Sequence, residues 1–231
     1  MNNKILCIIP ARGGSKGIKD KNIIDVAGKP LIAHSIELAR QLKEKSFIDK
    51  VIVSTDSEKI ANVAKSYGAE IPFLRPAEIS NDKAKSISFI LHALDFLEEK
   101  SEYFDAVLLL QPTSPLRTLE QLEESILVFN NNNSESLISC YKEEYINDLV
   151  MYRLKTSEEL EPLNEKHNKG VRRQDHGSIF VRNGSIYLTK TDYLNETHQI
   201  ISDSPLLFEM KKNDSINIDT LEDLELLRKV L

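Results

Sequence analysis

Glycines and cationic side chains are concentrated in one short segment near the start of the sequence, residues 10–22. Glycine backbones can turn several N–H groups toward one point, and Arg and Lys side chains neutralise negative charge. Such a group favours binding of phosphate oxygens, and a triphosphate suits this number of cations best. A solvated surface loop is the alternative interpretation. The glycines and cations are Gly13, Gly14, Gly17, Arg12, Lys16, Lys19 and Lys21.

Two standard phosphate-binding motifs do not fit this segment. It lacks the GxxxxGK[ST] of a P-loop, and its G-G-x-x-G spacing is a poor match to the dinucleotide fingerprint GxGxxG. Residues 5–9, which precede it, are all apolar. That run suits one buried strand and is too short to cross a membrane. We therefore expect a glycine-rich loop at the end of a buried strand.

Two further polar segments have the length and position of binding loops. Residues 75–86 form a long polar stretch, and loops of this length are more often functional than idle. Arg75 begins it, and a guanidinium can address two adjacent acceptors together. Residues 111–117 follow the apolar run 106–110, which suits a central strand. The alternatives are a plain surface connection for the first segment and a proline turn for the second.

The elements that position these segments alternate between strand and helix. Strands are expected at 50–54, 71–74, 106–110 and 136–140, with helices after Pro30, after Ser57 and after Ser86. This order predicts an α/β fold with a mainly parallel sheet and helices on both faces. Right-handed crossovers then place a ligand crevice at the carboxyl ends of the strands, where the glycine loop lies.

Composition narrows the class of protein. The chain has 231 residues, 41% of them hydrophobic and 29% charged, which suits a soluble protein with one sizeable core. A net charge of -6 without a basic stripe argues against a nucleic-acid partner. Cys7 and Cys140 have neither metal-ligand nor disulfide spacing. We expect a cytoplasmic protein with no membrane contact, since no apolar run is long enough to anchor it.

Five motifs together resemble one enzyme family, the cytidylyltransferases that make CMP-N-acylneuraminate and related CMP-nonulosonic acids. The resemblance covers nearly the whole chain, and the motifs occur in family order. It implies a nucleotide-diphospho-sugar transferase-like fold, of Rossmann type, and the reaction of CTP with a nonulosonic acid, either N-acetylneuraminate or a legionaminate-type analogue. It also implies Mg²⁺ as cofactor. The motifs are PARGGSKG with Lys21 and Asn22, RPAE at 75–78, LLQPTSPLR at 109–117, NGSIY at 183–187 and NIDT at 217–220.

The resemblance assigns roles to particular residues. Arg12 and Lys21 would handle the triphosphate as catalytic residues. Nucleotide contacts fall on Ser15, Asn22, Arg75, Ala84 and Ser86, of which the last three would receive the cytosine base. Sugar contacts fall on Gln111, Arg173, Gln174 and Tyr187. Tyr187 either faces the ligand or packs in the sheet, and the sequence leaves both open.

The metal site is where this chain departs from the family pattern. Family members usually carry Asp-Ile-Asp-Thr before the last helix, and the two carboxylates coordinate magnesium. Here the first position is Asn217, so most of the metal binding is expected to rest on Asp219. The alternative is that Asp219 only caps the helix that follows.

We expect a single domain over residues 1–231. Residues 141–176 have weak periodicity and much charge, and the resemblance implies that they form an arm that packs on a second subunit in a homodimer. A cytidylyltransferase for the eight-carbon acid Kdo is one alternative function, although the match to that related family is looser. A non-catalytic nucleotide-binding protein is another.

Overall fold

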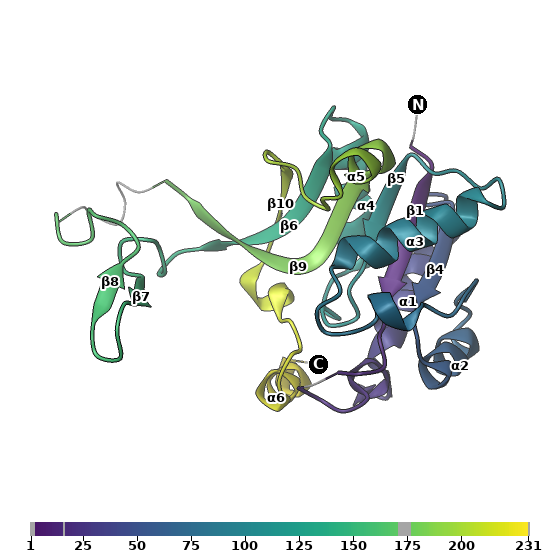
Figure 1. Ribbon diagram of the computed structural model, residues 1–231, viewed down its shortest axis with the longest axis horizontal. Helices are drawn as coiled ribbons and strands as arrows, with labels where there is room; N and C mark the ends of the chain where they lie inside the picture. Colours follow the sequence, from purple (N-terminus) through teal and green to yellow (C-terminus); the bar gives the residue numbers. More distant parts are fainter. Residues whose placement is uncertain (1–2, 16, 171–176, 231) are drawn as a thin grey trace.

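The computed structural model describes residues 3–15, 17–170 and 177–230. Its centre is a six-stranded sheet in the order β10-β6-β9-β5-β1-β4 (Figure 1). The β1–β4, β1–β5 and β6–β10 pairs are parallel, and β9 is antiparallel to both of its neighbours. The expected mainly parallel α/β fold is confirmed. The strands are β1 (Ile5–Pro10), β4 (Lys50–Ser54), β5 (Ala106–Leu109), β6 (Ser136–Glu143), β9 (Ile179–Lys190) and β10 (Leu206–Met210).

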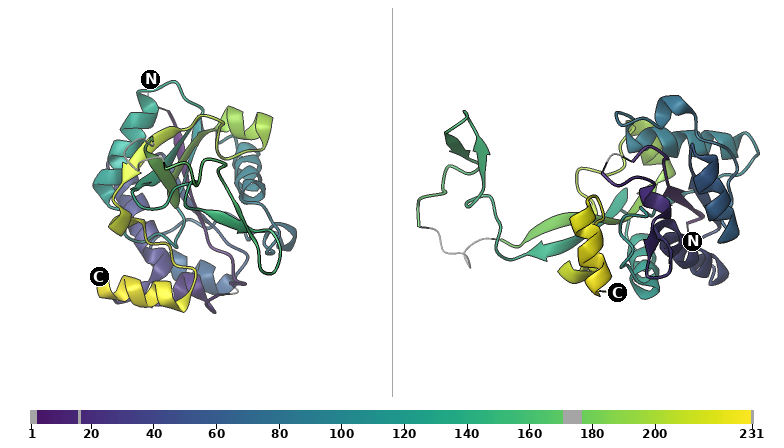
Figure 2. Two further views of the ribbon diagram at one scale, coloured as in Figure 1. Left: turned by 90° about the vertical axis from the view of Figure 1, so that its left-hand side faces the viewer. Right: turned by 90° about the horizontal axis from the view of Figure 1, so that it is seen from below.

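Helices cover both faces of this sheet (Figures 1 and 2). They are α1 (Leu31–Glu44), α2 (Glu58–Ser66), α3 (Ser86–Glu98), α4 (Leu119–Asn130) and α5 (Thr191–Thr197), whereas α6 (Leu221–Val230) packs elsewhere. Two short pairs lie outside the sheet, β2 (Asp25–Val26) with β3 (Lys29–Pro30) and β7 (Tyr152–Leu154) with β8 (Leu160–Pro162). Short 3₁₀ turns occupy Lys21–Ile23, Ala77–Ile79 and Lys212–Ser215.

Alternate residues of β1 supply the two halves of the core. Ile5, Cys7 and Ile9 pack among α1, α2 and α4, whereas Leu6 and Ile8 pack against α3 and α5. All five side chains are fully buried. A strand covered on both faces reads as a continuous apolar run, which is why this segment was identifiable from the sequence.

The last helix packs away from the sheet. Leu224 and Leu227 of α6 form a small separate core with Ile18, Val26 and Leu31. The C-terminal helix therefore rests on the glycine-rich loop and on the start of α1. This packing brings the residues just before α6 to the N-terminal loop.

One expected strand is absent, and one helix was not anticipated. Residues 71–74 form no strand; Glu70 and Leu74 make only isolated parallel bridges to β4, at Ile52 and Thr55. Pro72 has no N–H to donate, which limits pairing there. The α5 helix was not anticipated, because seven residues carry little periodicity.

The Asn183–Gly184 pair lies inside β9 and is not the turn before a strand that its sequence suggests. Gly184 has φ +76, in the left-handed region that favours glycine, and the β6–β9 register shifts beside it, between Ile138 and Cys140. The Asn183 Oδ1 accepts a hydrogen bond of 2.6 Å from Ser139 Oγ across the bulge. The motif therefore shapes the sheet.

An arm leaves the body of the protein at the far ends of β6 and β9. These strands stay paired as far as Glu143 and Ile179, and the β7–β8 hairpin extends beyond them (Figures 1 and 2). The arm carries many exposed apolar side chains. They are Tyr145, Ile146, Val150, Met151, Tyr152, Leu154, Leu160 and Leu163.

Among the residues that the structure describes, no helix has both the length and the hydropathy to cross a membrane.

Cys7 and Cys140 are both buried and unpaired, and burial raises the pKa of the Cys7 thiol to about 12. That thiol is therefore a packing group rather than a nucleophile.

Candidate active site

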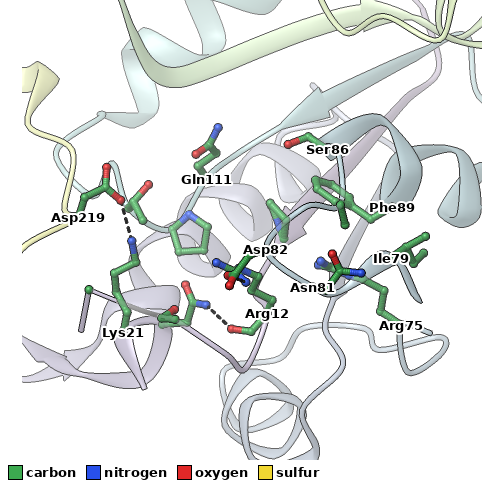
Figure 3. A pocket seen from close by; sticks show the side chains of 17 residues that line it. Arg12, Lys21, Arg75, Ile79, Asn81, Asp82, Ser86, Phe89, Gln111 and Asp219 are labelled. Atoms are coloured by element: carbon green, nitrogen blue, oxygen red, sulfur yellow. Dashed lines mark hydrogen bonds and ion pairs between the residues drawn. The ribbon is translucent and has the colours of Figure 1, made fainter. Parts of the chain in front are cut away.

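A cavity of about 500 Å³ opens at the carboxyl ends of β1 and β5. Four segments far apart in sequence form its wall: the glycine-rich loop, the region from Arg75 to Phe89, the residues after β5, and Asp219 (Figure 3). This is the predicted position of a ligand crevice, at the carboxyl ends of parallel strands. The predicted site residues that line it are Arg12, Ser15, Lys21, Asn22, Arg75, Ala84, Ser86, Gln111 and Asp219.

Tyr187 is a predicted sugar contact that is not among the residues lining this cavity. Tyr187 is only 9% exposed and packs in the core between Leu109 of β5 and Ile138 of β6. Burial raises the pKa of its phenol. Of the two roles left open for Tyr187, this burial favours packing in the sheet, and its contact with the sugar stays a prediction. Arg173 and Gln174 lie outside the described residues.

Lys21 and Asp219 meet at one end of the cavity (Figure 3). Lys21 Nζ donates to Asp219 Oδ1 at 2.8 Å and to the carbonyl of Ile218 at 2.9 Å. Asn217 Nδ2 donates to the second oxygen, Oδ2, at 2.6 Å. Both carboxylate oxygens are thus held by donors from the chain, one of them cationic.

Asn217 contacts Asp219 through its amide nitrogen. Its Oδ1 is buried and has no hydrogen-bond partner among the described residues. Asn217 therefore helps to orient the Asp219 carboxylate, and its own weak contact with a metal stays a prediction.

The helix-cap alternative for Asp219 is also resolved. The Asp223 carboxylate accepts from the N–H of Asp219 at 3.0 Å, the N–H of Thr220 at 2.7 Å and the Thr220 hydroxyl at 2.8 Å. Thr220 Oγ1 accepts in return from the N–H of Asp223. These hydrogen bonds lower the pKa of Asp223 and cap α6. The Asp219 side chain therefore does not cap α6; it is 64% exposed and borders the cavity.

The glycine-rich loop is held from several sides. Arg12 Nη1 lies 2.5 Å from Asp82 Oδ1, an ion pair that links this loop to the loop before α3. The Asn22 amide donates to the Arg12 carbonyl at 3.0 Å, and Asp56 Oδ1 accepts from the N–H of Gly13 at 2.8 Å. The cations at the cavity are therefore fixed by neighbouring side chains, which reduces the cost of ordering them around an anion.

Arg75 marks the opposite end of the cavity from Lys21 (Figure 3). The residue is 5% exposed, and its guanidinium donates from Nε to Ser54 Oγ at 3.0 Å and from Nη2 to the Ser54 carbonyl. Burial lowers its pKa to about 10, so it remains cationic at neutral pH. Among the described residues it forms no ion pair. A buried cation with spare donors at a cavity is a feature that a ligand with acceptor atoms would satisfy.

Arg117 is a site-supporting residue that the sequence did not reveal. It is buried, and its guanidinium donates to the carbonyls of Gln111 and Ser185, each at 2.8 Å, and to the hydroxyl of Ser35. Burial lowers its pKa to about 10. The arginine of the LLQPTSPLR motif thus joins α1 and β9 to the backbone of Gln111 on the cavity wall. Its place at the end of this motif did not indicate that its side chain would be buried.

The fold and the cavity together define an α/β protein with a cation-lined site for an anionic ligand at its strand ends. Residues 6–230 match the family described as cytidylyltransferase. The chain therefore belongs to the cytidylyltransferase family, and the family predicted from its motifs is confirmed.

Sequence similarity to individual family members extends over most of the chain. A pseudaminic acid cytidylyltransferase of Campylobacter jejuni is 36% identical, over 96% of this chain and 94% of that protein. An N-acylneuraminate cytidylyltransferase of Escherichia coli is 35% identical, over 98% of this chain and 52% of that protein. The solved structure of a CMP:2-keto-3-deoxy-manno-octonic acid synthetase complexed with CTP shares the fold, with a TM-score of 0.70, 18% identity and coverage of 98% of each chain.

Gly17 gives a test of how the site is assembled. A Cβ built on it would lie 2.3 Å from the carbonyl oxygen of Asp219, whereas one on Gly14 would meet nothing within 4 Å. We expect Gly17→Ala to lower the free energy of unfolding by about 1–3 kcal/mol, since backbone must move. Gly14→Ala should be close to neutral. Urea unfolding of both variants measures this, and equal losses would contradict close packing of Gly17 on the C-terminal segment.

Proposed function

We propose that this cytidylyltransferase activates a nonulosonic acid with CTP, giving the CMP-linked sugar and pyrophosphate. The observation that carries the proposal is the order of cations along one cavity, with Arg75 at one end, Lys21 at the other and Arg12 between them (Figure 3). That order suits a nucleotide base, a triphosphate and a second substrate that bind one after another along the cavity. The names of the relatives support the choice of sugar class.

The chemistry is a phosphoryl-type transfer. The anomeric hydroxyl of the sugar acid attacks the α-phosphorus of CTP, the bond to the β-phosphate oxygen breaks, and pyrophosphate leaves. Such a reaction needs in-line positioning and neutralisation of charge more than a covalent nucleophile. Arg12 and Lys21 supply fixed positive charge beside the phosphates, and Gln111 faces the same cavity from the end of β5.

The site fits Mg²⁺ with Asp219 as its ligand from the chain. Magnesium takes one or two carboxylates and completes its shell with phosphate oxygens and water. Asp219 offers one exposed carboxylate at the cavity, and the described residues contain no group of three His, Cys, Asp or Glu side chains that could hold a metal unaided. When bound, the ion would neutralise phosphate oxygens and favour departure of pyrophosphate.

The particular sugar acid is open to a direct test. Relatives named for pseudaminic acid and for N-acylneuraminate are 36% and 35% identical to this chain, so overall identity does not separate them. The test is pyrophosphate release from CTP with N-acetylneuraminate, a legionaminate-type acid, pseudaminate and Kdo. We expect one nine-carbon acid to be turned over best. Preference for Kdo would overturn the proposed sugar class, and CTP binding without pyrophosphate release for any acid would favour a nucleotide-binding protein.

We also propose that the arm at 141–176 packs on a second copy of the chain, because it protrudes with exposed apolar side chains. Leu154 and Leu160 face each other across β7 and β8. The double variant Leu154→Glu with Leu160→Arg places opposite charges across the hairpin and removes its apolar surface. Light scattering should show a dimer for the wild type and for Leu127→Glu on α4, and a monomer for the double variant. A monomeric wild type would refute the proposal.

Lys21 is expected to act in the transition state. Replacing it by Met removes one fixed cation, so kcat should fall about 100-fold, on the order of 3 kcal/mol. Lys59→Met is the matched control, since Lys59 makes a similar ion pair, 2.7 Å to Asp20, but does not line the cavity. Steady-state kinetics of both folded variants measure the difference. A Lys21 variant with unchanged kcat would remove this residue from the catalytic assignment.

Magnesium dependence is expected to rest on Asp219. The Asn217→Asp change adds a second carboxylate and should lower the magnesium concentration that gives half-maximal rate. Asp219→Asn should lower activity by about 10- to 100-fold or more, because a charged ligand is lost. A magnesium titration of the two variants tests this. Near wild-type activity of Asp219→Asn at low magnesium would mean that other groups hold the metal.

A further inference from the structure

We propose that Phe89 and Ser54 are positioning residues that fix the plane of the Arg75 guanidinium and thereby set the choice of nucleotide base. This inference rests on the proposed function and deepens it. The chain's assignment to the family says nothing of either residue, and neither was singled out by the sequence motifs. Phe89 lines the cavity at the end where Arg75 is found, and Ser54 lies buried behind Arg75 and accepts its hydrogen bonds.

Arg75 is anchored to the end of β4 through its backbone and its side chain. Its N–H donates to the Thr55 carbonyl at 2.7 Å, beside the isolated bridge between Thr55 and Leu74. Its guanidinium donates to both the hydroxyl and the carbonyl of Ser54. Ser54 is completely buried, so its two acceptors are rigidly placed. One edge of the guanidinium is therefore held against the sheet.

The same guanidinium also lies over an aromatic ring. The Cζ of Arg75 lies 4.7 Å from the centroid of the Phe89 ring, which comes from the first turn of α3. A cation over an aromatic face is attracted by the ring quadrupole, and the attraction is stronger where water is excluded. Arg75 and Phe89 are only 5% and 7% exposed. The contacts with Ser54 and with the Phe89 ring together restrict how the guanidinium can turn.

The remaining donors face a place suited to a flat ligand. A guanidinium has five N–H groups, and Ser54 accepts from two different nitrogens, so donors remain for the cavity. Ile79 and Phe89 add apolar surface at this end, beside Ser86 (Figure 3). An apolar slot with a fixed row of donors matches a planar heterocycle that has two adjacent acceptors.

Orientation matters here because cytosine and uracil share one of these acceptors. Cytosine presents O2 and N3 as neighbouring acceptors, whereas uracil presents O2 but carries a hydrogen on N3. A guanidinium held in the base plane can donate to both cytosine atoms and meets the N3 hydrogen of uracil unfavourably. One that tilts keeps its bond to O2, which both bases offer. Loosening Arg75 should therefore lower selectivity more than it lowers binding.

Phe104 provides a closely matched control for Phe89. Both residues are 7% exposed, and both belong to the core on the α3 side of the sheet. Phe104 also has a cation over its ring, since the Lys4 ammonium lies 4.9 Å from the ring centroid. Phe104 precedes β5 at the opposite end of the strands from the cavity and does not line it. Replacing either ring by Leu removes similar packing and one cation–ring contact, but only Phe89→Leu affects Arg75.

The experiment measures kcat/KM for CTP and for UTP, by pyrophosphate release with the preferred sugar acid, in the wild type and in both variants. We expect Phe89→Leu to narrow the preference for CTP over UTP by roughly 3- to 30-fold, the range of a desolvated cation–ring contact. Phe104→Leu should keep the wild-type ratio. The thermal midpoints of the two variants should fall by similar amounts, which separates selectivity from stability.

Ser54→Ala gives a second route to the same conclusion. It removes the acceptor of Arg75 Nε without removing a ring, and should narrow the preference in the same direction even if Phe89→Leu fails to fold. Unchanged CTP/UTP ratios in Ser54→Ala and in folded Phe89→Leu, or an equal change in Phe104→Leu, would overturn the positioning role. A wild type that does not use CTP would instead overturn the proposed function.

Discussion

The cavity depends on contact between the glycine-rich loop and the segment before α6. Gly17 meets the Asp219 carbonyl so closely that no side chain fits between them, and Lys21 bonds to Asp219 and Ile218 nearby. The small α6 core, with Ile18 beneath it, provides the apolar attraction that keeps these backbones together. Glycine is thus needed at this position because the two backbones approach so closely.

Supporting residues fix the polar groups of the site so that little ordering is left for a ligand to impose. Asn217 and Lys21 hold both oxygens of Asp219, Asp82 holds Arg12, and Arg117 holds the backbone of Gln111. A preorganised arrangement of charges is what phosphoryl transfer requires, because reorganising polar groups during the reaction would raise its barrier. The membership of the chain in the cytidylyltransferase family is consistent with that requirement.

Much of this could be predicted from the sequence, for a definite physical reason. Strands buried on both faces are continuous apolar runs, and polar residues just after them must come together at one edge of a parallel sheet. The roles of Arg117, Phe89 and Tyr187 could not be predicted in this way. An arginine, a phenylalanine and a tyrosine can each point into a core or into a cavity, and neighbouring packing decides which. The same limit applies to Asn217, whose amide can present either its nitrogen or its oxygen.

The strand order of the sheet also has a consequence for how the protein is made. In the sheet, the half formed by β1, β4 and β5 meets the half formed by β6 and β10 only through β9, which is translated after β1, β4, β5 and β6. On the ribosome, the first half can fold early, but its β5 edge stays open until β9 emerges. Asp219 arrives later still. A nascent chain therefore cannot complete its cavity until residue 219 has been translated, so products truncated before that residue would lack part of the cavity wall.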